Sequence, residues 1–312
     1  MNVLVVTNMW PTAEEPSFGC FVAEQVEDLR GLGLHVDVIA FDGRRDRRKY
    51  VRAAQAVRHA VRHQPVSIVH AHYGLTGAVA AMQRSAPVIT TFHGSDTGYV
   101  PWQARVSRVV AARTTPLFVS RAGAEALGRP HAAVLPAPVD IDRFIPIDRA
   151  EARERLGWNP DGLYALFPGS RTNQRKRPDL FDAAVNEARR SLPNLEAKAL
   201  EGFSRDEVVL ALNAADVTVM VSDWEGSPVT VRESLACMTP VVSVEVGDVR
   251  EVIDGLATCT LVSRDPSQLG AAIAEAVTRP RESNLRDRAE ETSRPRVAEQ
   301  LVALYGQVAC AS

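Results

Sequence analysis

The feature that most constrains the fold is a series of short apolar runs that alternates with helical patterns along all 312 residues. The runs are rich in Val, Ile and Leu, and Gly, Pro and Asn bound them. They occupy residues 3–6, 36–41, 67–70, 88–91, 117–119, 132–135, 164–167, 195–200, 217–221, 241–244 and 260–262. Such continuous runs are typical of parallel strands buried on both faces. The alternation with helices therefore predicts an α/β fold with parallel sheets.

A proline-rich segment interrupts the series. Residues 136–162 contain four prolines and no strand pattern, and we interpret 136–147 as a connection between two α/β domains. The predicted domains are residues 1–140 and 141–293, and 294–312 is expected to form a C-terminal helix that could pack back on the first domain. Ligands of open α/β folds bind beyond the carboxyl ends of the strands, so we expect a site in a cleft between the two sheets.

Composition excludes several classes of protein. The apolar share of 46% and the charged share of 24% are those of a soluble globular chain. A net charge of -2 argues against a nucleic-acid-binding protein. The start, MNVLVVTNMW, is interpreted as a first strand and not a signal peptide, and no apolar run approaches the roughly 20 residues of a membrane span. With four scattered cysteines, predicted to be reduced core or near-core thiols, we expect a cytoplasmic protein, with peripheral membrane contact left open.

Two glutamates lie at the predicted tip of a buried strand, in DWEGSPVTVRESLACMTPVVS, residues 223–243. Glu225 and Glu233 have seven residues between them, and a Gly-Ser-Pro turn follows the first. A helix from about Pro228 would place Ser227 at the N-cap and Pro228 at the first helical position. Both carboxylates are then expected on one side, where they could accept hydrogen bonds from a polyol. Carboxylates near a helix start also occur for stability alone.

A basic turn follows another predicted strand, in FPGSRTNQRKRPDL, residues 167–180. Arg171, Arg175, Lys176 and Arg177 precede a predicted helix. Guanidinium and ammonium groups beside a strand-to-helix turn are suited to bind phosphate. The alternative is a solvated basic turn, which this segment alone does not exclude.

Three further segments are less specific. A loop at 90–99 contains His93 in HGSD, a pattern that is more often structural than catalytic. Gly19, within 11–29, could let the backbone approach a ligand, although the chain has no G-x-G-x-x-G fingerprint in its strand-to-helix turns. Residues 44–63 are rich in Arg, Lys and His, and form either a solvated helix face or a patch for an anionic acceptor or a membrane surface.

Taken in order, these segments resemble one family over nearly the whole chain: GT-B glycosyltransferases of the large retaining family 4. The most specific part is SDWEGSPVTVRESLACMTPVVSVEVGDVREVI, which is similar to the family pattern S…EG.P…EA.A…PVV…VGD..E. The resemblance implies two Rossmann-like domains and transfer of a sugar from a nucleoside-diphosphate sugar to a hydroxyl acceptor. It also implies retention of anomeric configuration, with neither a metal nor a separate cofactor.

The resemblance implies roles for residues in the second half of the chain. Arg171 and Lys176 would bind the donor diphosphate and stabilise the charge that develops as it leaves. Glu225 would bind hydroxyls of the donor sugar, with the N–H groups of Gly226 and Ser227 nearby. Because the leaving phosphate is thought to take the acceptor's proton, no carboxylate need act as a nucleophile.

Other implied roles fall in both halves. Glu233 would accept hydrogen bonds from the ribose, and Gly202 and Phe203 would hold the base. His93 would lie near the reacting sugar, and Gly19 would face the diphosphate and the acceptor. A uridine diphosphate donor is our first expectation and guanosine diphosphate the second, while the acceptor stays open among lipid-linked saccharides, polysaccharide intermediates and small natural products. The first loop departs from the paired glycines of many relatives, which puts the acceptor most in doubt.

The sequence also raises three rival interpretations. Asp140 and Asp142 could be metal-binding aspartates of a GT-A transferase, but they lie in the proline-rich connection. A nucleotide-sugar 2-epimerase would need acid/base groups in the first domain, for which His93 and Asp96 are candidates. A catalytically idle partner subunit would not require the basic turn and both glutamates together.

Overall fold

The computed structural model describes residues 1–15, 18–44, 46–281 and 283–311. Arg45 of the basic 44–63 segment lies outside the described residues, as do Pro16 and Ser17 of the 11–29 segment. The chain divides into two compact units: unit 1 contains Met1–Ala137 and Arg294–Ser312, and unit 2 contains Pro138–Ser293. All the predicted apolar runs form strands, and every strand pair is parallel, which confirms the α/β class.

Unit 1 is built on a six-stranded sheet of order β2-β1-β3-β4-β5-β6. Its strands are β1 Asn2–Thr7, β2 His35–Ala40, β3 Ile68–His72, β4 Val88–Phe92, β5 Thr115–Phe118 and β6 Ala133–Val134. Side chains alternate between the faces of a strand, and both faces of β1 are buried. Val3 and Val5 belong to one apolar cluster, and Leu4 and Val6 belong to another. This two-sided burial explains why the strand is a continuous apolar run.

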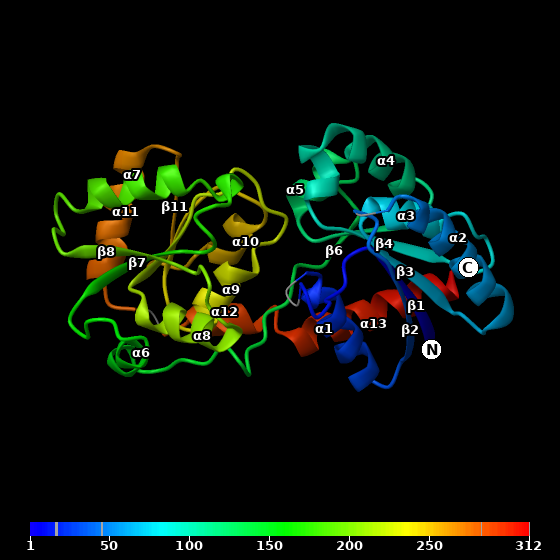
Figure 1. Ribbon diagram of the computed structural model, residues 1–312, viewed down its shortest axis with the longest axis horizontal. Coiled ribbons are helices and arrows are strands. Elements are labelled where there is room, and N and C mark those ends of the chain that lie inside the picture. The colour runs from blue at the N-terminus through cyan, green and yellow to red at the C-terminus, as the bar shows by residue number, and fades with distance from the viewer. Residues whose placement is uncertain (16–17, 45, 282, 312) are drawn as a thin grey trace. The chain divides into compact units, whose positions relative to one another are not determined.

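Helices cover both faces of this sheet (Figure 1). One face carries α1 Cys20–Gly31 and α13 Arg294–Cys310, and the other carries α2 Arg48–His63, α3 Gly74–Ala80, α4 Pro101–Ala111 and α5 Arg121–Ala126. A single π-helical turn, η1 Ser95–Tyr99, precedes α4. The last helix is held to unit 1 by the fully buried Tyr305 and by an ion pair of 2.7 Å between Arg294 and Asp28.

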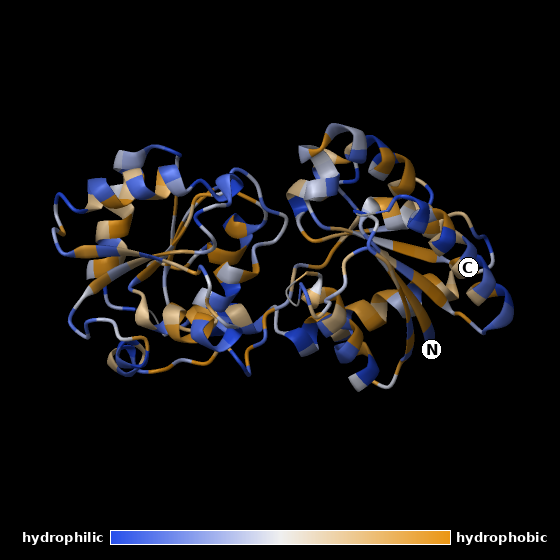
Figure 2. Ribbon diagram, viewed as in Figure 1, coloured by the Kyte–Doolittle hydropathy of each residue, from blue (hydrophilic) through white to orange (hydrophobic). Residues whose placement is uncertain are grey.

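Unit 2 contains a five-stranded sheet of order β11-β10-β9-β7-β8. Its strands are β7 Leu163–Phe167, β8 Leu195–Ala199, β9 Val217–Met220, β10 Val241–Val244 and β11 Thr260–Val262. Its helices are α6 Arg149–Arg155, α7 Pro178–Ala188, α8 Arg205–Ala214, α9 Val229–Ala236, α10 Val249–Ile253, α11 Pro266–Thr278 and α12 Leu285–Glu290. Helices α7 and α11 lie on one face and α8, α9 and α12 on the other (Figure 1). Figure 2 shows apolar residues concentrated along the strands of both units.

Two local predictions need correction. Helix α9 begins at Val229 with Pro228 as its N-cap residue, one position later than predicted, and Ser227 does not cap it. The Ser227 hydroxyl instead donates a hydrogen bond of 2.7 Å to Asp248. The cysteines are free thiols, but Cys310 is exposed and is not a core residue, whereas burial raises the pKa of Cys237 to about 12.

Candidate functional site

The loop between β7 and α7 brings a lysine over its own glycine turn. A short 3-10 turn, η2 Gln174–Lys176, directs Lys176 back toward the end of β7. A methyl group on Gly169 would lie 2.5 Å from Cδ of Lys176, so the lysine stem can lie here only because residue 169 has no side chain. The Lys176 side chain is 17% exposed and lies at the carboxyl end of the strand.

The loop between β9 and α9 places Glu225 beside that lysine. Strands β7 and β9 are neighbours in the sheet, so the loops that follow them meet. The Nζ atom of Lys176 lies 3.4 Å from Glu225, and the guanidinium of Arg175 lies 2.8 Å from the other carboxylate oxygen. Ser222 donates a hydrogen bond of 2.8 Å to the same carboxylate. The structure thus unites two predicted site residues, Lys176 and Glu225. Arg175 is a third member of the site, to which the sequence assigns no role beyond that of a basic residue in the turn.

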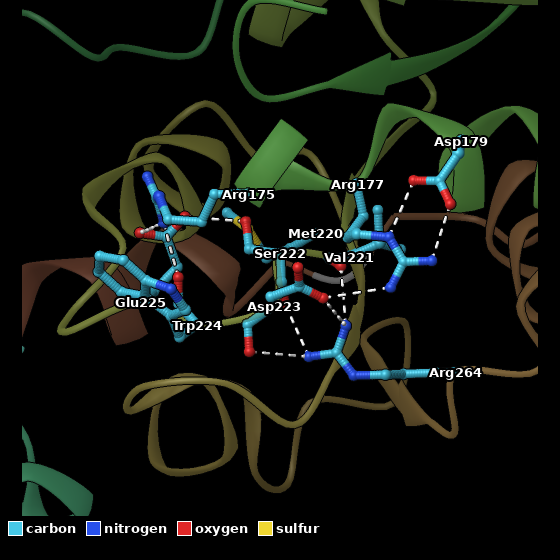
Figure 3. A network of polar contacts seen from close by, with 10 residues as sticks. All are labelled: Arg175, Arg177, Asp179, Met220, Val221, Ser222, Asp223, Trp224, Glu225 and Arg264. Carbon is cyan, nitrogen blue, oxygen red and sulfur yellow. Dashed lines mark hydrogen bonds and ion pairs between the residues drawn. The ribbon is translucent and has the colours of Figure 1, made fainter. Parts of the chain in front are cut away.

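The loop that carries Glu225 is held by arginines on two sides (Figure 3). Arg175 donates to the carbonyl of Trp224 at 2.6 Å and lies over the Trp224 ring, 4.6 Å from its centroid. The backbone N–H of Asp223 donates to the carbonyl of Arg175 at 2.8 Å. Arg177 forms an ion pair of 3.1 Å with the Asp223 side chain. These contacts fix the position of the two residues that precede Glu225.

Arg264, which follows β11, holds the other side of the loop. Its guanidinium donates to three successive carbonyls, those of Val221 at 3.1 Å, Ser222 at 2.7 Å and Asp223 at 3.1 Å. Sequence reasoning missed Arg264, because no local pattern connects it with a loop some forty positions earlier.

Arg171 and Glu233 have other partners in this structure. Arg171 donates to both oxygens of Asp182 at 2.8 Å, so its predicted action with Lys176 on a diphosphate stays a prediction. Glu233 is 3% exposed and forms an ion pair of 2.7 Å with Arg205, the first residue of α8. The predicted pairing of the two glutamates in one site also stays a prediction, since they contact different cations. Arg205 carries no motif, and sequence reasoning missed it.

A buried ion pair connects the start of α9 with the loop after β10. Arg232 is 2% and Asp248 is 7% exposed, and their side chains lie 2.5 Å apart. Arg232 also donates to the Ser227 hydroxyl at 3.0 Å. The carbonyl of Gly226 comes so close to Gly247 that a methyl group there would lie 2.8 Å from it. The turn predicted to surround a donor sugar is therefore rigidly supported from within unit 2.

The remaining predicted residues of unit 2 lie after β8. Gly202 has a φ of 75°, a left-handed conformation that glycine adopts without strain. Phe203 is partly buried against the core of unit 2. This glycine forms the turn that separates β8 from α8, and the predicted contact of both residues with a base stays a prediction.

In unit 1, His93 follows β4 and is held by Asp96. The buried Asp96 carboxylate accepts backbone N–H bonds from His93 at 2.9 Å, Gly94 at 3.1 Å and Gly74 at 2.8 Å. Burial raises the pKa of Asp96 to about 6, against the lowering effect of these bonds. Since Asp96 ties the loops after β3 and β4 together, its contacts favour a structural role over the acid/base role of an epimerase.

Gly19 is the N-cap residue of α1 and has a φ of 75°. A methyl group there would lie 2.3 Å from the carbonyl carbon of Met9, so close backbone packing requires glycine. A cavity of about 520 Å³ lies nearby, within unit 1. Its walls are Asn8, Met9, Phe18, Gly43, Arg44, Arg47, Tyr50, Tyr73, Leu75, Ser95, Trp102 and Gln103.

Among the described residues, no group of three or more His, Cys, Asp or Glu side chains is arranged to hold a metal ion. No helix in the described ranges is long and apolar enough to cross a membrane.

Comparison with known proteins gives consistent matches in both units. Residues 2–137 match the model of the glycosyl transferase 4-like domain, and residues 167–279 match that of the glycosyl transferases group 1. The chain is 30% identical to a D-inositol 3-phosphate glycosyltransferase of Geodermatophilus obscurus, over 81% of this chain and 69% of that protein. It is 26% identical to the putative teichuronic acid biosynthesis glycosyltransferase TuaC of Bacillus subtilis, over 89% of each chain.

Solved structures agree with the fold. A sucrose-phosphate synthase from Thermosynechococcus elongatus superposes with a TM-score of 0.81 and 17% identity, over 100% of both chains. HepE from Anabaena, in complex with UDP and glucose, superposes with a TM-score of 0.72 and 15% identity, over 98% of this chain and 99% of that one. These similarities confirm the predicted GT-B fold.

Proposed function

The chain belongs to the glycosyl transferases group 1, a family of GT-B glycosyltransferases, and from that premise we propose that it transfers a sugar from a nucleoside-diphosphate sugar to a hydroxyl acceptor. Transfer proceeds with retention of configuration and without a metal ion. The acceptor belongs to saccharide, glycolipid or natural-product biosynthesis, and the reaction takes place in the cytoplasm.

The proposed donor site rests on one observation, the cluster of Lys176, Arg175 and Glu225 at the carboxyl ends of β7 and β9. Two cations there can neutralise the charge that develops on a leaving diphosphate. Glu225 is 13% exposed and keeps acceptor capacity for sugar hydroxyls. In the absence of a donor its charge is balanced by the two cations, and we infer that a bound diphosphate takes over those cations.

Uridine diphosphate is the first candidate for the nucleotide, and guanosine diphosphate is the second. Support comes from HepE, a GT-B protein whose complexes contain UDP, UDP-glucose and glucose. Arg205 follows Gly202 and Phe203 closely in sequence and holds Glu233 by its ion pair, and in this proposal these residues surround the ribose and base.

The acceptor site lies in the 520 Å³ cavity of unit 1. Its walls combine the aromatic rings of Tyr50, Tyr73 and Trp102 with the polar side chains of Asn8 and Gln103. Aromatic surfaces with a few polar groups are typical of small-molecule sites, and this lining suits a sugar ring or another hydroxylated small molecule. The similar proteins of Geodermatophilus obscurus and Bacillus subtilis are a D-inositol 3-phosphate glycosyltransferase and a putative teichuronic acid biosynthesis glycosyltransferase, and a hydroxylated acceptor agrees with both.

A thermal-shift panel tests the donor proposal. UDP, GDP, ADP and dTDP are added to the wild type and to Lys176→Met, each with and without a chelator. A nucleotide at about 100 times its dissociation constant should stabilise the native state by roughly 2.7 kcal/mol. We expect UDP to raise the melting temperature, with no effect of the chelator and a smaller shift in Lys176→Met.

The matched control is Lys198→Met. Lys198 is a partly exposed lysine of β8 whose ammonium group pairs with Glu196 at 2.9 Å, away from the Glu225 cluster. It should respond to UDP as the wild type does. If no nucleotide shifts the wild type, or if both lysine variants respond alike, the assigned donor site is wrong. A shift that the chelator abolishes would refute metal independence alone.

A further inference from the structure

Three histidine rings form a row inside unit 1. His70 and His72 are two residues apart on β3, so both point to the face that α13 covers, and their ring centroids lie 4.4 Å apart. His93 follows β4, the neighbour of β3, and its Nε2 lies 3.2 Å from Nδ1 of His72. At the far end, His70 contacts the hydroxyls of Tyr305 at 2.6 Å and Thr91 at 2.7 Å.

All three rings are neutral near pH 7. Burial lowers the pKa of His70 to about 3 and that of His93 to about 4, and it lowers the pKa of His72 well below its ordinary value. A neutral imidazole has one N–H donor and one lone pair. The contact between His72 and His93 therefore holds a single hydrogen, and the ring that provides it determines the tautomer of both.

The other nitrogen of His72 decides between the two arrangements. His72 is 1% exposed, and its Nε2 has no hydrogen-bond partner within the described ranges. If His93 were the donor, the N–H of His72 would be at Nε2, buried and unpaired. If His72 is the donor, only a lone pair is left without a partner. Buried N–H groups without an acceptor are rarer than acceptors without a donor, so the second arrangement is favoured.

We propose that His72 is a positioning residue: it donates its Nδ1–H to Nε2 of His93 and holds His93 as the Nδ1–H tautomer. The Nδ1–H of His93 then has no acceptor among the described residues and is available to an oxygen of the substrate. This last step rests on the proposed function, because it takes His93 to lie at the reacting sugar. The tautomer assignment itself concerns the protein alone.

The backbone after His72 keeps the donor in place. Tyr73 has a φ of 87°, a conformation that is strained for a residue with a side chain. Its N–H donates to the carbonyl of Thr91 at 2.8 Å, and its hydroxyl contacts Ser95 at 2.9 Å and Gln103 at 2.6 Å. These bonds join the end of β3 to the loop that carries His93. Strained residues persist only where their surroundings hold them, and such places are often functional.

Nitrogen NMR of the full-length protein, labelled with ¹⁵N-histidine, tests the assignment. Long-range ¹H–¹⁵N spectra distinguish a protonated from an unprotonated ring nitrogen, and the loss of signals in His93→Gln identifies His93. We expect Nδ1 of His93 to be protonated and Nε2 to be unprotonated at pH 7.5. The opposite pattern would overturn the proposal, whether or not the protein has transferase activity.

Two variants connect the tautomer with turnover. His72→Phe cannot donate, so His93 should shift toward the Nε2–H tautomer and kcat should fall at least tenfold, with little change in the KM of the donor. His72→Asn can place its amide N–H at the Nδ1 position. It should therefore restore part of the wild-type His93 tautomer and part of the lost kcat. His70→Phe is the matched control. It replaces a buried imidazole on the same face of β3, and that imidazole forms no hydrogen bond with His93.

The control should keep the wild-type signals of His93 and a kcat within about threefold. An equal loss of kcat in both phenylalanine variants, or an unchanged His93 tautomer in His72→Phe, would mean that His72 only fills space. If no variant and no wild type turns over, the proposed function fails, and the spectra still decide the tautomer.

Discussion

Replacing Arg232 by methionine should destabilise unit 2 strongly. Methionine has a similar length, so the change creates little empty space and chiefly removes a buried charge. Asp248, which is 7% exposed, would lose the partner at 2.5 Å and keep the Ser227 hydroxyl at 2.7 Å. The Thr292 hydroxyl would lose the guanidinium at 3.1 Å. Breaking a buried ion pair by removing one partner costs about 3–5 kcal/mol.

A second variant separates the charge from the packing. In Arg232→Met with Asp248→Leu, no charge is left unpaired, and apolar replacements of a buried pair are often neutral or better. The double variant should therefore be at least 2 kcal/mol more stable than Arg232→Met alone, on the order of a strong coupling in a double-mutant cycle.

The assay is guanidinium unfolding followed by tryptophan fluorescence. In a background where Trp10 and Trp102 are phenylalanine, the signal comes from Trp158 and Trp224 of unit 2, so its transition is read separately from that of unit 1. A loss below about 1 kcal/mol for Arg232→Met would show that water reaches Asp248 and that the pair is not effectively buried. A double variant as unstable as the single one would point to packing instead of charge.

Three further outcomes are expected. Glu225→Gln should lower kcat/KM by roughly a hundredfold, measured with the donor identified by thermal shift, and change stability by less than about 1 kcal/mol, because partly exposed pairs contribute little; a rate near that of the wild type would remove Glu225 from the site. Gly19→Ala should cost more than about 1 kcal/mol in chemical denaturation, since its φ and its approach to Met9 both exclude a methyl group, whereas Gly31→Ala has open space and should be neutral. Acid should destabilise unit 1: the folded pKa of His93, about 4, lies below the unfolded value near 6.5, so stability is full above pH 6.5 and is lost as pH falls toward 4, by about 1.4 kcal/mol per pH unit for each net proton. The folded pKa of Asp96, about 6, lies above its ordinary value, so between pH 4 and 6 its protonation in the folded state offsets the destabilisation caused by one histidine. A denaturation midpoint that is constant from pH 7 to 4.5 would contradict the burial of the histidines.

Strand positions and the fold class could be predicted from the sequence because their cause is local. A parallel strand covered on both faces must be apolar at every position, as Val217–Met220 is, and that requirement is visible in the run itself. The predicted start of α9 was wrong by one residue because Ser227, a favourable capping residue, is held by Asp248 and Arg232, which are distant in sequence.

The candidate site could likewise be predicted from the sequence only in part. The sequence shows which residue types the basic turn and the Glu225 loop contain. Lys176 and Glu225 do meet, at the ends of neighbouring strands. What the chain order does not report is which cation each carboxylate contacts. Arg175 and not Arg171 reaches Glu225, Arg205 reaches Glu233, and Arg264 holds the loop through three carbonyls.

The sequence by itself determined the alternation of strands and helices, the class of fold and the chemical types gathered at the strand ends. Tertiary structure alone decided the pairings: the row of His70, His72 and His93, and the arginines around Glu225. The physical reason is the distance along the chain over which each interaction acts. Burial and helix periodicity act on neighbours along the chain, whereas ion pairs and ring contacts depend on side-chain directions of elements that only the folded sheet brings together.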